Sequence, residues 1–172
     1  MNVPEKLINF RVYENGNDLV GVADVELPSL ETMTETVKGA GVAGEVDSPV
    51  MGHFGSMELT LNWRTLEKTN IKLAVFGGVA LDLRGSQQVY DSNSATLKTI
   101  GTKVVIRGIP KNTELGKLEV GTTTDTSNVI EVTYLKVDID GETVLEVDKY
   151  NFICVINGMD YLASVRENLG LA

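Results

Sequence analysis

MELTLNWR, residues 57–64, is the stretch of sequence that decides the fold class. Apolar and polar side chains alternate at every position in it. Because successive side chains of a strand point to opposite faces, this alternation produces one apolar face and one polar face. Antiparallel strands with one face in the core and the other in water show this pattern. We therefore predict a half-buried antiparallel strand whose apolar face carries Met57, Leu59, Leu61 and Trp63.

Hairpins are predicted where a turn dipeptide separates two apolar, β-branched runs. The clearest is Asp140-Gly141, which separates residues 129–139 from residues 143–147. A second is Asn15-Gly16 near the start of the chain. Both dipeptides tolerate the positive φ angles that tight hairpin turns require. The other predicted strands are 10–13, 19–23, 32–38, 79–83, 104–106 and 152–156.

Two short helices are predicted outside the strands. Residues 66–76 have apolar side chains at positions 71, 74 and 75, and Thr65 is available as their N-cap. Residues 160–169 follow the same logic, with Asp160 as the N-cap. No internal repeat, proline-rich linker or change of composition divides the chain, so we expect a single domain over residues 1–172. The predicted long loops are 39–55 and 120–127.

The composition argues against several classes of function. A net charge of −9, from 24 acidic and 15 basic residues, opposes tight wrapping of nucleic acid, which needs clustered cations. One cysteine and one histidine, far apart in sequence, do not suit a Cys/His zinc site or a disulfide framework. The chain has no apolar run of membrane-spanning length and no start typical of a signal peptide, so we expect a cytoplasmic protein.

Residues 39–44 match the G-x-G-x-x-G pattern of dinucleotide-binding loops. In those proteins a buried parallel strand precedes the pattern and a helix follows it, so that helix amides hold the pyrophosphate. Here residues 32–38 are threonine-rich, and Pro49, Gly52 and Gly55 disfavour a helix afterwards. We therefore expect a long, flexible, glycine-rich loop and no bound nucleotide. Loops of this length are usually functional, and an arm that orders against a neighbouring subunit is one such function.

No catalytic, metal or cofactor site is predicted. His53 has Asp47 nearby, but no G-x-S-x-G nucleophile elbow accompanies them. Cys154 lies between two apolar residues and is expected to pack as a small apolar side chain. The acidic run 138–148 contains Asp140-Gly141, and its glycine is misplaced for a calcium-binding loop. We therefore expect a protein that is not an enzyme and carries no cofactor.

Two classes of function remain open at this point, a sugar- or ligand-binding β-sandwich and a self-assembling structural protein. Aromatic residues make up 6% of the chain, and the single tryptophan, Trp63, lies in the apolar stripe of residues 57–64. Exposed aromatic rings are the usual surface for binding sugars. The composition therefore favours assembly.

Several stretches, in order and spacing, resemble the major tail tube protein of contractile-tailed bacteriophages and of phage-tail-like bacteriocins. The resemblance covers essentially the whole chain. It includes the strand with Trp63 and a following helix like residues 66–76. The other matching segments are Pro4-Glu5-Lys6-Leu7, Leu27-Pro28-Ser29-Leu30, Lys38-Gly39-Ala40-Gly41, Val155-Ile156-Asn157-Gly158-Met159-Asp160 and Arg166-Glu167-Asn168-Leu169-Gly170-Leu171.

This resemblance implies a mainly β fold, an antiparallel β-barrel or sandwich with one flanking helix and a short C-terminal helix. It also implies that six copies form a ring and that rings stack into a hollow tube inside a sheath. The implied partners are other copies of this chain, the sheath protein, baseplate and terminator proteins, and DNA in the lumen if the particle is a phage. No membrane partner is implied. The alternatives are a tube protein of a type VI secretion system and a ligand-binding β-sandwich.

The glycine-rich segment at about 39–55 is the predicted subunit interface. Its glycines permit unusual backbone conformations, and its apolar side chains have no obvious role on a solvated loop. The candidate interface residues are Gly39, Gly41, Val42, Gly44, Val46, Val50, Met51 and Phe54.

Overall fold

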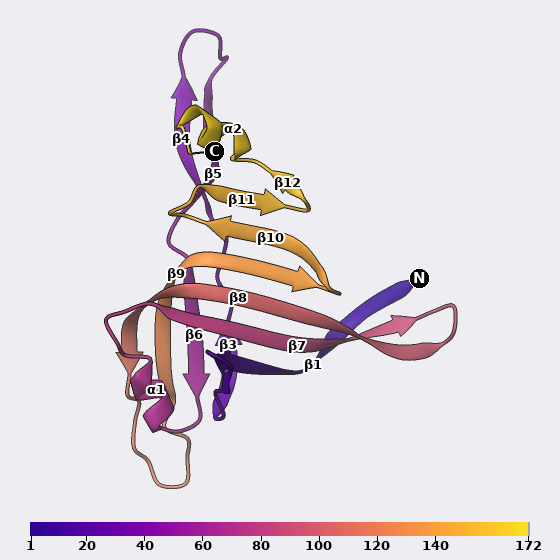
Figure 1. Cartoon of the computed structure of the whole chain (residues 1–172), viewed down its shortest axis with the longest axis vertical. Coiled ribbons are helices and arrows are strands. Elements are labelled where there is room, and N and C mark those ends of the chain that lie inside the picture. Colours follow the sequence, from indigo (N-terminus) through magenta and orange to yellow (C-terminus); the bar gives the residue numbers. More distant parts are fainter. Residues whose placement is uncertain (172) are drawn as a thin grey trace.

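The computed structural model describes residues 1–171, and antiparallel strands make up most of it (Figure 1). Two short helices, α1 (Lys68–Lys72) and α2 (Ala163–Asn168), accompany the strands. No helix within these residues is long and apolar enough to cross a membrane. The strands are β1 (Asn2–Glu14), β2 (Asn17–Asp18), β3 (Val22–Glu26), β4 (Thr32–Lys38), β5 (Glu45–Phe54), β6 (Glu58–Trp63), β7 (Val79–Asp91), β8 (Thr96–Glu114), β9 (Thr126–Ile139), β10 (Glu142–Asp148), β11 (Ile153–Ile156) and β12 (Met159–Asp160).

One branched, ten-stranded sheet supplies two layers of the fold. Its main path runs β12-β11-β10-β9-β8-β7-β1-β2, and β6 joins β3 to β9 off this path. The first half of β9 pairs with β6, whereas the second half pairs with β10. The long strand β9 therefore passes from one layer to the other, and the core lies between the layers. Among residues 1–171 the sheet stays open, so the sandwich alternative, and not a closed barrel, describes the single chain.

A glycine marks the place where the sheet changes direction. Gly108 lies at a register shift between β8 and β9. A Cβ atom at this position would lie 2.1 Å from the backbone oxygen of Glu131. No other residue fits so close to a neighbouring strand, and such bulges increase the local bend and twist of a strand.

The prediction for residues 57–64 is confirmed. Met57, Leu59, Leu61 and Trp63 are all buried in the core cluster, and the polar residues between them are more exposed. β6 lies between β3 and β9, so both of its edges are paired. The apolar face of this strand therefore forms part of the core.

The two hairpin predictions have different outcomes. Asp140-Gly141 forms the predicted turn between β9 and β10, with φ angles of +53° and +77°. Asn15-Gly16 also forms a turn, but β2 contributes only a two-residue ladder to β1. The main partner of β1 is β7, and β3 pairs with β6 instead of returning along β1. Long-range pairing thus overrides the local hairpin signal in the first part of the chain.

Both helices are shorter than predicted and begin later. Glu67, and not Thr65, is the N-cap of α1, because Glu67 and Asn70 cap each other reciprocally. Leu162, and not Asp160, precedes α2. Asp160 instead accepts hydrogen bonds from Arg166, which hold the pKa of this carboxyl below its ordinary value.

Two further corrections concern strand length and loop position. The predicted strands 79–83 and 104–106 are short parts of β7 and β8, which have 13 and 19 residues and pair along the whole of β7. The predicted loop 120–127 ends early, because β9 begins at Thr126. Cys154 packs in β11 as predicted, and its burial raises the pKa of the thiol.

Candidate subunit interface

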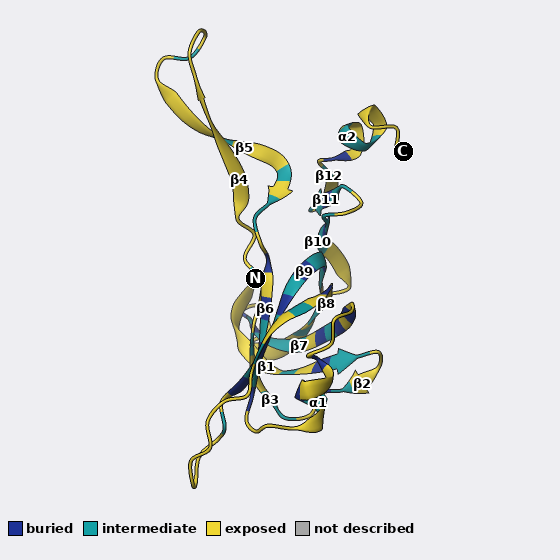
Figure 2. Cartoon of the chain, turned by 90° about the vertical axis from the view of Figure 1, so that its left-hand side faces the viewer, coloured by how far each residue is buried: buried dark blue, intermediate teal, exposed yellow. Residues whose placement is uncertain are grey.

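The segment predicted as a long flexible loop, 39–55, is mostly strand. β4 and β5 form a separate two-stranded hairpin, and only residues 39–44 form its turn. The prediction was wrong because a two-stranded ribbon needs little apolar alternation when neither face is covered by its own chain. This β4–β5 hairpin projects from the sandwich at one end of the long axis of the molecule (Figures 1 and 2). All seven residues of β4 are exposed.

The three glycines of the G-x-G-x-x-G pattern shape the tip of this hairpin. Gly39, Gly41 and Gly44 have φ angles of +112°, +89° and +113°, a region that favours glycine. The backbone N–H of Val42 donates to the oxygen of Gly39 at 3.1 Å, which closes the turn. Because a strand follows the pattern, no helix N-terminus is present to hold a phosphate. The pattern encodes a wide hairpin turn.

The two faces of the hairpin differ in polarity. One carries threonines and charged groups, and the other, which we call the apolar face, carries three large apolar side chains together with Glu35 and Ser48. Thr36 pairs with Asp47 and donates a side-chain hydrogen bond to it at 2.9 Å. On the opposite face Val37 pairs directly with Val46, and Met33 lies further along the same strand face. These three apolar side chains are 43%, 55% and 52% exposed, respectively. The apolar face is exposed in the single chain, and this exposure makes it a candidate for contact with another molecule.

The root of the hairpin is fixed to the sandwich by a bulge in β5. Thr32 pairs with Phe54, but Thr34 pairs with Pro49, so four residues of β5 lie opposite one residue of β4. Within this bulge Gly52 has a φ of +71° and packs against the side chain of Leu162. Two hydrogen bonds add to this: Gly55 N–H donates to the backbone oxygen of Glu31 at 2.8 Å, and the side-chain Nζ of Lys149 donates to the backbone oxygen of Gly55 at 2.7 Å.

A charged network lies directly behind this root. Ser56 Oγ donates to the two oxygens of Glu131 at 2.8 and 2.7 Å, and Lys111 Nζ donates to it at 2.9 Å. Partial burial alone would raise the pKa of Glu131, but the bonds from Lys111 and Ser56 outweigh it and the pKa is lowered. Glu131 therefore stays ionised and ties the chain between β5 and β6 to β9.

Replacing Gly52 is expected to loosen the root of the hairpin. In a Gly52→Ala variant the new Cβ would lie 2.6 Å from the Leu162 side chain, and the positive φ adds strain. We expect a loss of roughly 2 kcal/mol or more in the free energy of unfolding. Gly41→Ala is the matched control, because its φ is also positive but nothing lies within 4 Å, and about 1 kcal/mol is expected. Urea unfolding measures both, and equal losses would contradict the packing role of Gly52.

The structure places all eight predicted interface residues on this hairpin, in three different settings. The glycines and Val42 form the tip, and Val46 lies on the apolar face. Val50 and Met51 lie in the bulge and are 38% and 52% exposed. Phe54 is partly buried against the core cluster, so it supports the root. The structure adds Met33 and Val37 to the candidate interface residues, because both lie on the apolar face. The alternation within residues 32–38 is the sequence pattern that could have identified them.

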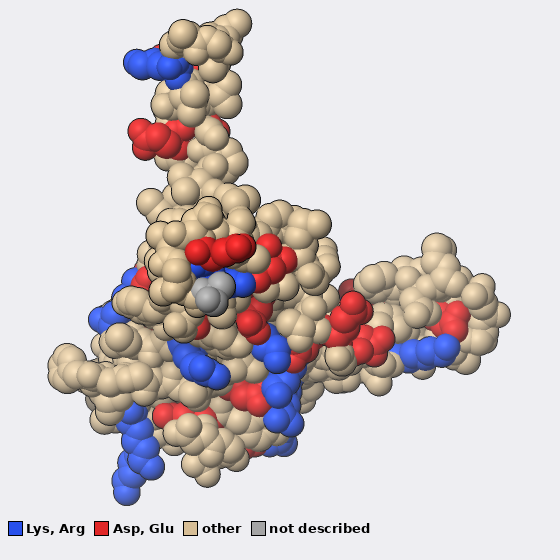
Figure 3. Space-filling view, turned by 45° about the horizontal axis from the view of Figure 1, so that its top comes forward, with Lys and Arg blue, Asp and Glu red and all other residues tan. Residues whose placement is uncertain are grey.

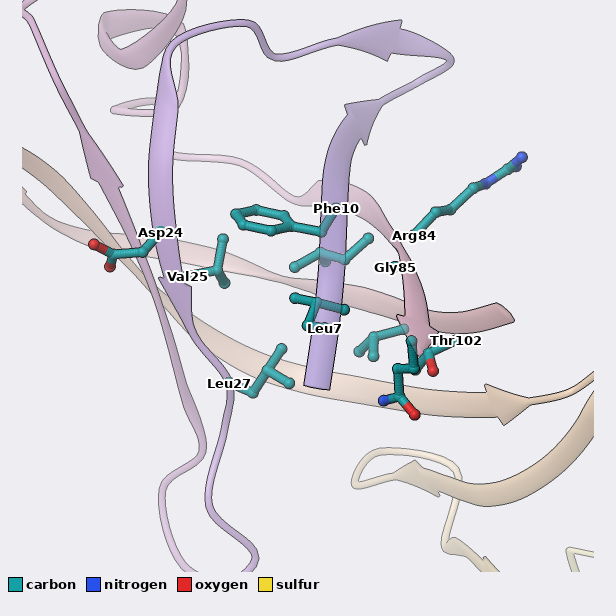
Figure 4. A pocket seen from close by; sticks show the side chains of 11 residues that line it. Leu7, Phe10, Asp24, Val25, Leu27, Arg84, Gly85 and Thr102 are labelled. Atoms are coloured by element: carbon teal, nitrogen blue, oxygen red, sulfur yellow. The ribbon is translucent and has the colours of Figure 1, made fainter. Parts of the chain in front are cut away.

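A second surface feature is an apolar groove of about 370 Å³ between β1, β3 and the β7–β8 pair. Figure 4 shows Leu7, Phe10, Val25 and Leu27 around it, with the charged ends of Asp24 and Arg84 directed outward. The groove is an opening between the two layers of the sandwich at the unpaired side of β3. It gives the single chain another apolar surface that a neighbour can cover.

These features define a class of protein, an antiparallel β domain with exposed apolar surfaces and open strand edges. The family model for the phage tail tube protein FII matches residues 4–170. This chain therefore belongs to the phage tail tube protein family.

Two relatives agree with this assignment. The chain is 32% identical to the tail tube protein of Escherichia phage P2, over 99% of this chain and 100% of that protein. It is 27% identical to the major tail tube protein of Serratia phage KSP20, over 99% of each. The resemblance noted in the sequence is thus confirmed at the level of the family.

Proposed function

We propose that this chain is the repeating structural subunit of the inner tube of a contractile phage tail or phage-tail-like bacteriocin. In this proposal six copies form a ring, and the rings stack into a hollow conduit through the cell envelope. Membership of the tail tube family over almost the whole chain supports the structural role. The observation of the structure that carries the proposal is the projecting β4–β5 hairpin, whose apolar face is exposed in a single chain.

Open strand edges supply the lateral contacts in this proposal. Within residues 1–171, β3 pairs only with β6, and β12 pairs only with β11. Exposed edges of this kind are templates for pairing with another chain, and closure of a ring removes them. Edge pairing between neighbours would join the sheets of the subunits into one continuous barrel around the lumen.

The partners and location follow from the same proposal. The tube would assemble in the bacterial cytoplasm and then form part of the virion tail or of a released particle. Its outer wall would contact the sheath protein, and its ends would contact baseplate and terminator proteins. In a phage, DNA would pass through the lumen, and the net charge of −9 would limit adhesion to its phosphates. The chain would have no enzymatic activity, cofactor or membrane partner.

Two alternatives were considered, a tube protein of a type VI secretion system and a ligand-binding β-sandwich. The family match favours a phage-type tail tube over the secretion system. The apolar groove of Figure 4 is the feature that a ligand-binding protein would use. Because its charged residues turn outward, the groove offers few polar groups to orient a small ligand.

Electron microscopy of the purified protein tests the proposal. We expect hollow rings or tubes after concentration. Persistent monomers whose melting temperature rises with a glycan or nucleotide would contradict the proposal and favour the ligand-binding alternative.

A further inference from the structure

The outer part of the β4–β5 hairpin, residues 33–49, has few contacts that fix its direction relative to the sandwich. Within the described chain its one ion pair, Lys38 with Glu45 at 3.9 Å, joins the two strands of the hairpin itself. Its side-chain hydrogen bond, from Thr36 to Asp47, is also internal. Figure 3 shows few charged groups on this projection, whereas acidic and basic groups lie close together on the body of the molecule. The direction of the hairpin is therefore set at its root.

The root contains an interruption at which the hairpin can bend. Thr32 pairs with Phe54 and Thr34 pairs with Pro49, so the four residues between Pro49 and Phe54 lie outside the regular ladder. Gly52 lies in this interruption with a φ of +71°. A glycine has more backbone freedom than any other residue, and an interrupted ladder has fewer backbone hydrogen bonds to oppose bending. Without support from outside the hairpin, the interruption would act as a hinge.

The C-terminal segment supplies such support through Leu162. This side chain is 3% exposed and lies directly against the backbone of Gly52, where an added Cβ atom would be 2.6 Å from the leucine carbons. Gly52, Phe54 and Leu162 also border a cavity of about 130 Å³, together with Phe152. Leu162 therefore occupies space into which the interruption of β5 would otherwise move.

Asp160 and Arg166 hold Leu162 in this position. The backbone N–H of Leu162 donates to Asp160 Oδ1 at 3.2 Å, and its backbone oxygen accepts from the N–H of Arg166 at 2.9 Å. The guanidinium of Arg166 donates to both carboxylate oxygens of Asp160 and, at 2.8 Å, to the backbone oxygen of Phe152. Because Phe152 directly precedes β11, these bonds tie Leu162 to the sandwich.

We propose that residues 159–169, which include β12 and α2, are a strap that sets the direction of the hairpin. Leu162 is the part of the strap that contacts the hairpin, and the pair of Asp160 and Arg166 fastens it to the sandwich. These three are positioning residues, since they act on assembly through the hairpin. A hairpin that swings freely spends only a fraction of its time in the direction that assembly needs, and the apparent affinity falls by that fraction. This last step rests on the proposed tube function, whereas the strap itself is a property of the single chain.

Two spin labels measure the direction of the hairpin in the single chain. One is attached through Ala43→Cys at the tip and the other through Thr99→Cys on β8, because both positions are exposed and Cys154 is buried. For Leu162→Ala we expect the distribution of distances between the labels to broaden about twofold or more. Leu81→Ala is the matched control, because it removes the same atoms from a leucine that is 2% exposed in the core on β7. This control should lose stability without broadening the distribution.

Arg166→Met tests the fastening of the strap separately. It keeps much of the apolar stem and removes the donors to Asp160 and Phe152, so it should also broaden the distribution. Because Leu162 remains, this variant decides the matter even if Leu162→Ala folds poorly. A distribution as narrow as that of the wild type in either folded variant, or equal broadening in Leu81→Ala, would overturn the strap.

Assembly is the second readout, and sedimentation over a concentration series measures it. We expect the hairpin of Leu162→Ala to keep the required direction about one fifth of the time, so the concentration needed for tubes should rise about fivefold. Leu81→Ala should assemble near the wild-type concentration. Broader distances with unchanged assembly would also overturn the inference, and the tube function would stand. Failure of the wild-type protein to form rings or tubes would instead overturn the proposed function, while the distance measurement still decides whether the strap exists.

Discussion

Trp63→Ala is expected to lower the free energy of unfolding by about 3–5 kcal/mol, because it removes one of the largest buried side chains of the core. Trp63 is 2% exposed and lies at the end of β6, between Val22 of β3 and Thr126 of β9. The surrounding strands are held in register by their backbone hydrogen bonds, so they can close only part of the cavity. Urea unfolding of the isolated protein measures the loss.

Trp63→Phe is the informative companion. The indole Nε1 is buried and has no hydrogen-bond partner within residues 1–171. A buried unpaired donor costs free energy, so replacing the ring with phenyl removes that penalty while it keeps most of the apolar volume. We expect Trp63→Phe to lose less than half as much stability as Trp63→Ala. Arg64→Ala, an exposed change on the next residue, should stay within about 0.5 kcal/mol. Equal losses for Phe and Ala would contradict this account.

The core strand of residues 57–64 and the Asp140-Gly141 hairpin could be predicted because local pattern and tertiary environment agree there. Each alternates with period two, and each has a buried face in the sandwich. β8 could not be predicted in full, because much of it outside Val104, Val105 and Ile106 is glycine, threonine or lysine. Pairing with β7 on one edge and β9 on the other stabilises those residues as strand. Local propensity does not contain that information.

The hairpin was misjudged for a related reason. Pro49 and Gly52 interrupt β5, and such residues normally argue against a strand. Both are tolerated because the hairpin has free edges and because Gly52 lies in a bulge with positive φ. The glycines of the tip were correctly interpreted as backbone-permissive positions. That the segment after the turn forms a strand, β5, paired with β4 was apparent only from the structure.

The exposed apolar side chains around α1 were not predicted from the sequence. Position 71 was one of the apolar positions that indicated a helix over residues 66–76, but Ile71 is 48% exposed, whereas Leu73 and Asn70 are buried. A helix as short as α1 has little more than one turn, so a few apolar positions do not determine which side faces the core. Exposure of apolar side chains without a partner is a property of packing, and sequence alone does not reveal it.

Val37→Asn combined with Val46→Asn is expected to abolish tube formation at protein concentrations that suffice for the wild type. The two side chains are directly paired on the apolar face and are 43% and 55% exposed in one chain. The monomer should therefore keep its melting temperature. In the assembly each valine that becomes buried contributes about 1.5 kcal/mol or more, so the concentration needed for tubes should rise about 100-fold or more.

Thr34→Asn combined with Thr36→Asn is the matched control on the other face of the same hairpin. It changes two residues of the same strand ribbon to the same side chain and also leaves the net charge unaltered. If the apolar face makes the subunit contact, this control assembles near the wild-type concentration, because its polar face is not covered by apolar groups of a neighbour. Sedimentation and electron microscopy over a concentration series compare the two variants. Loss of tubes in the threonine variant with normal assembly of the valine variant would show that the polar face of the hairpin makes the contact.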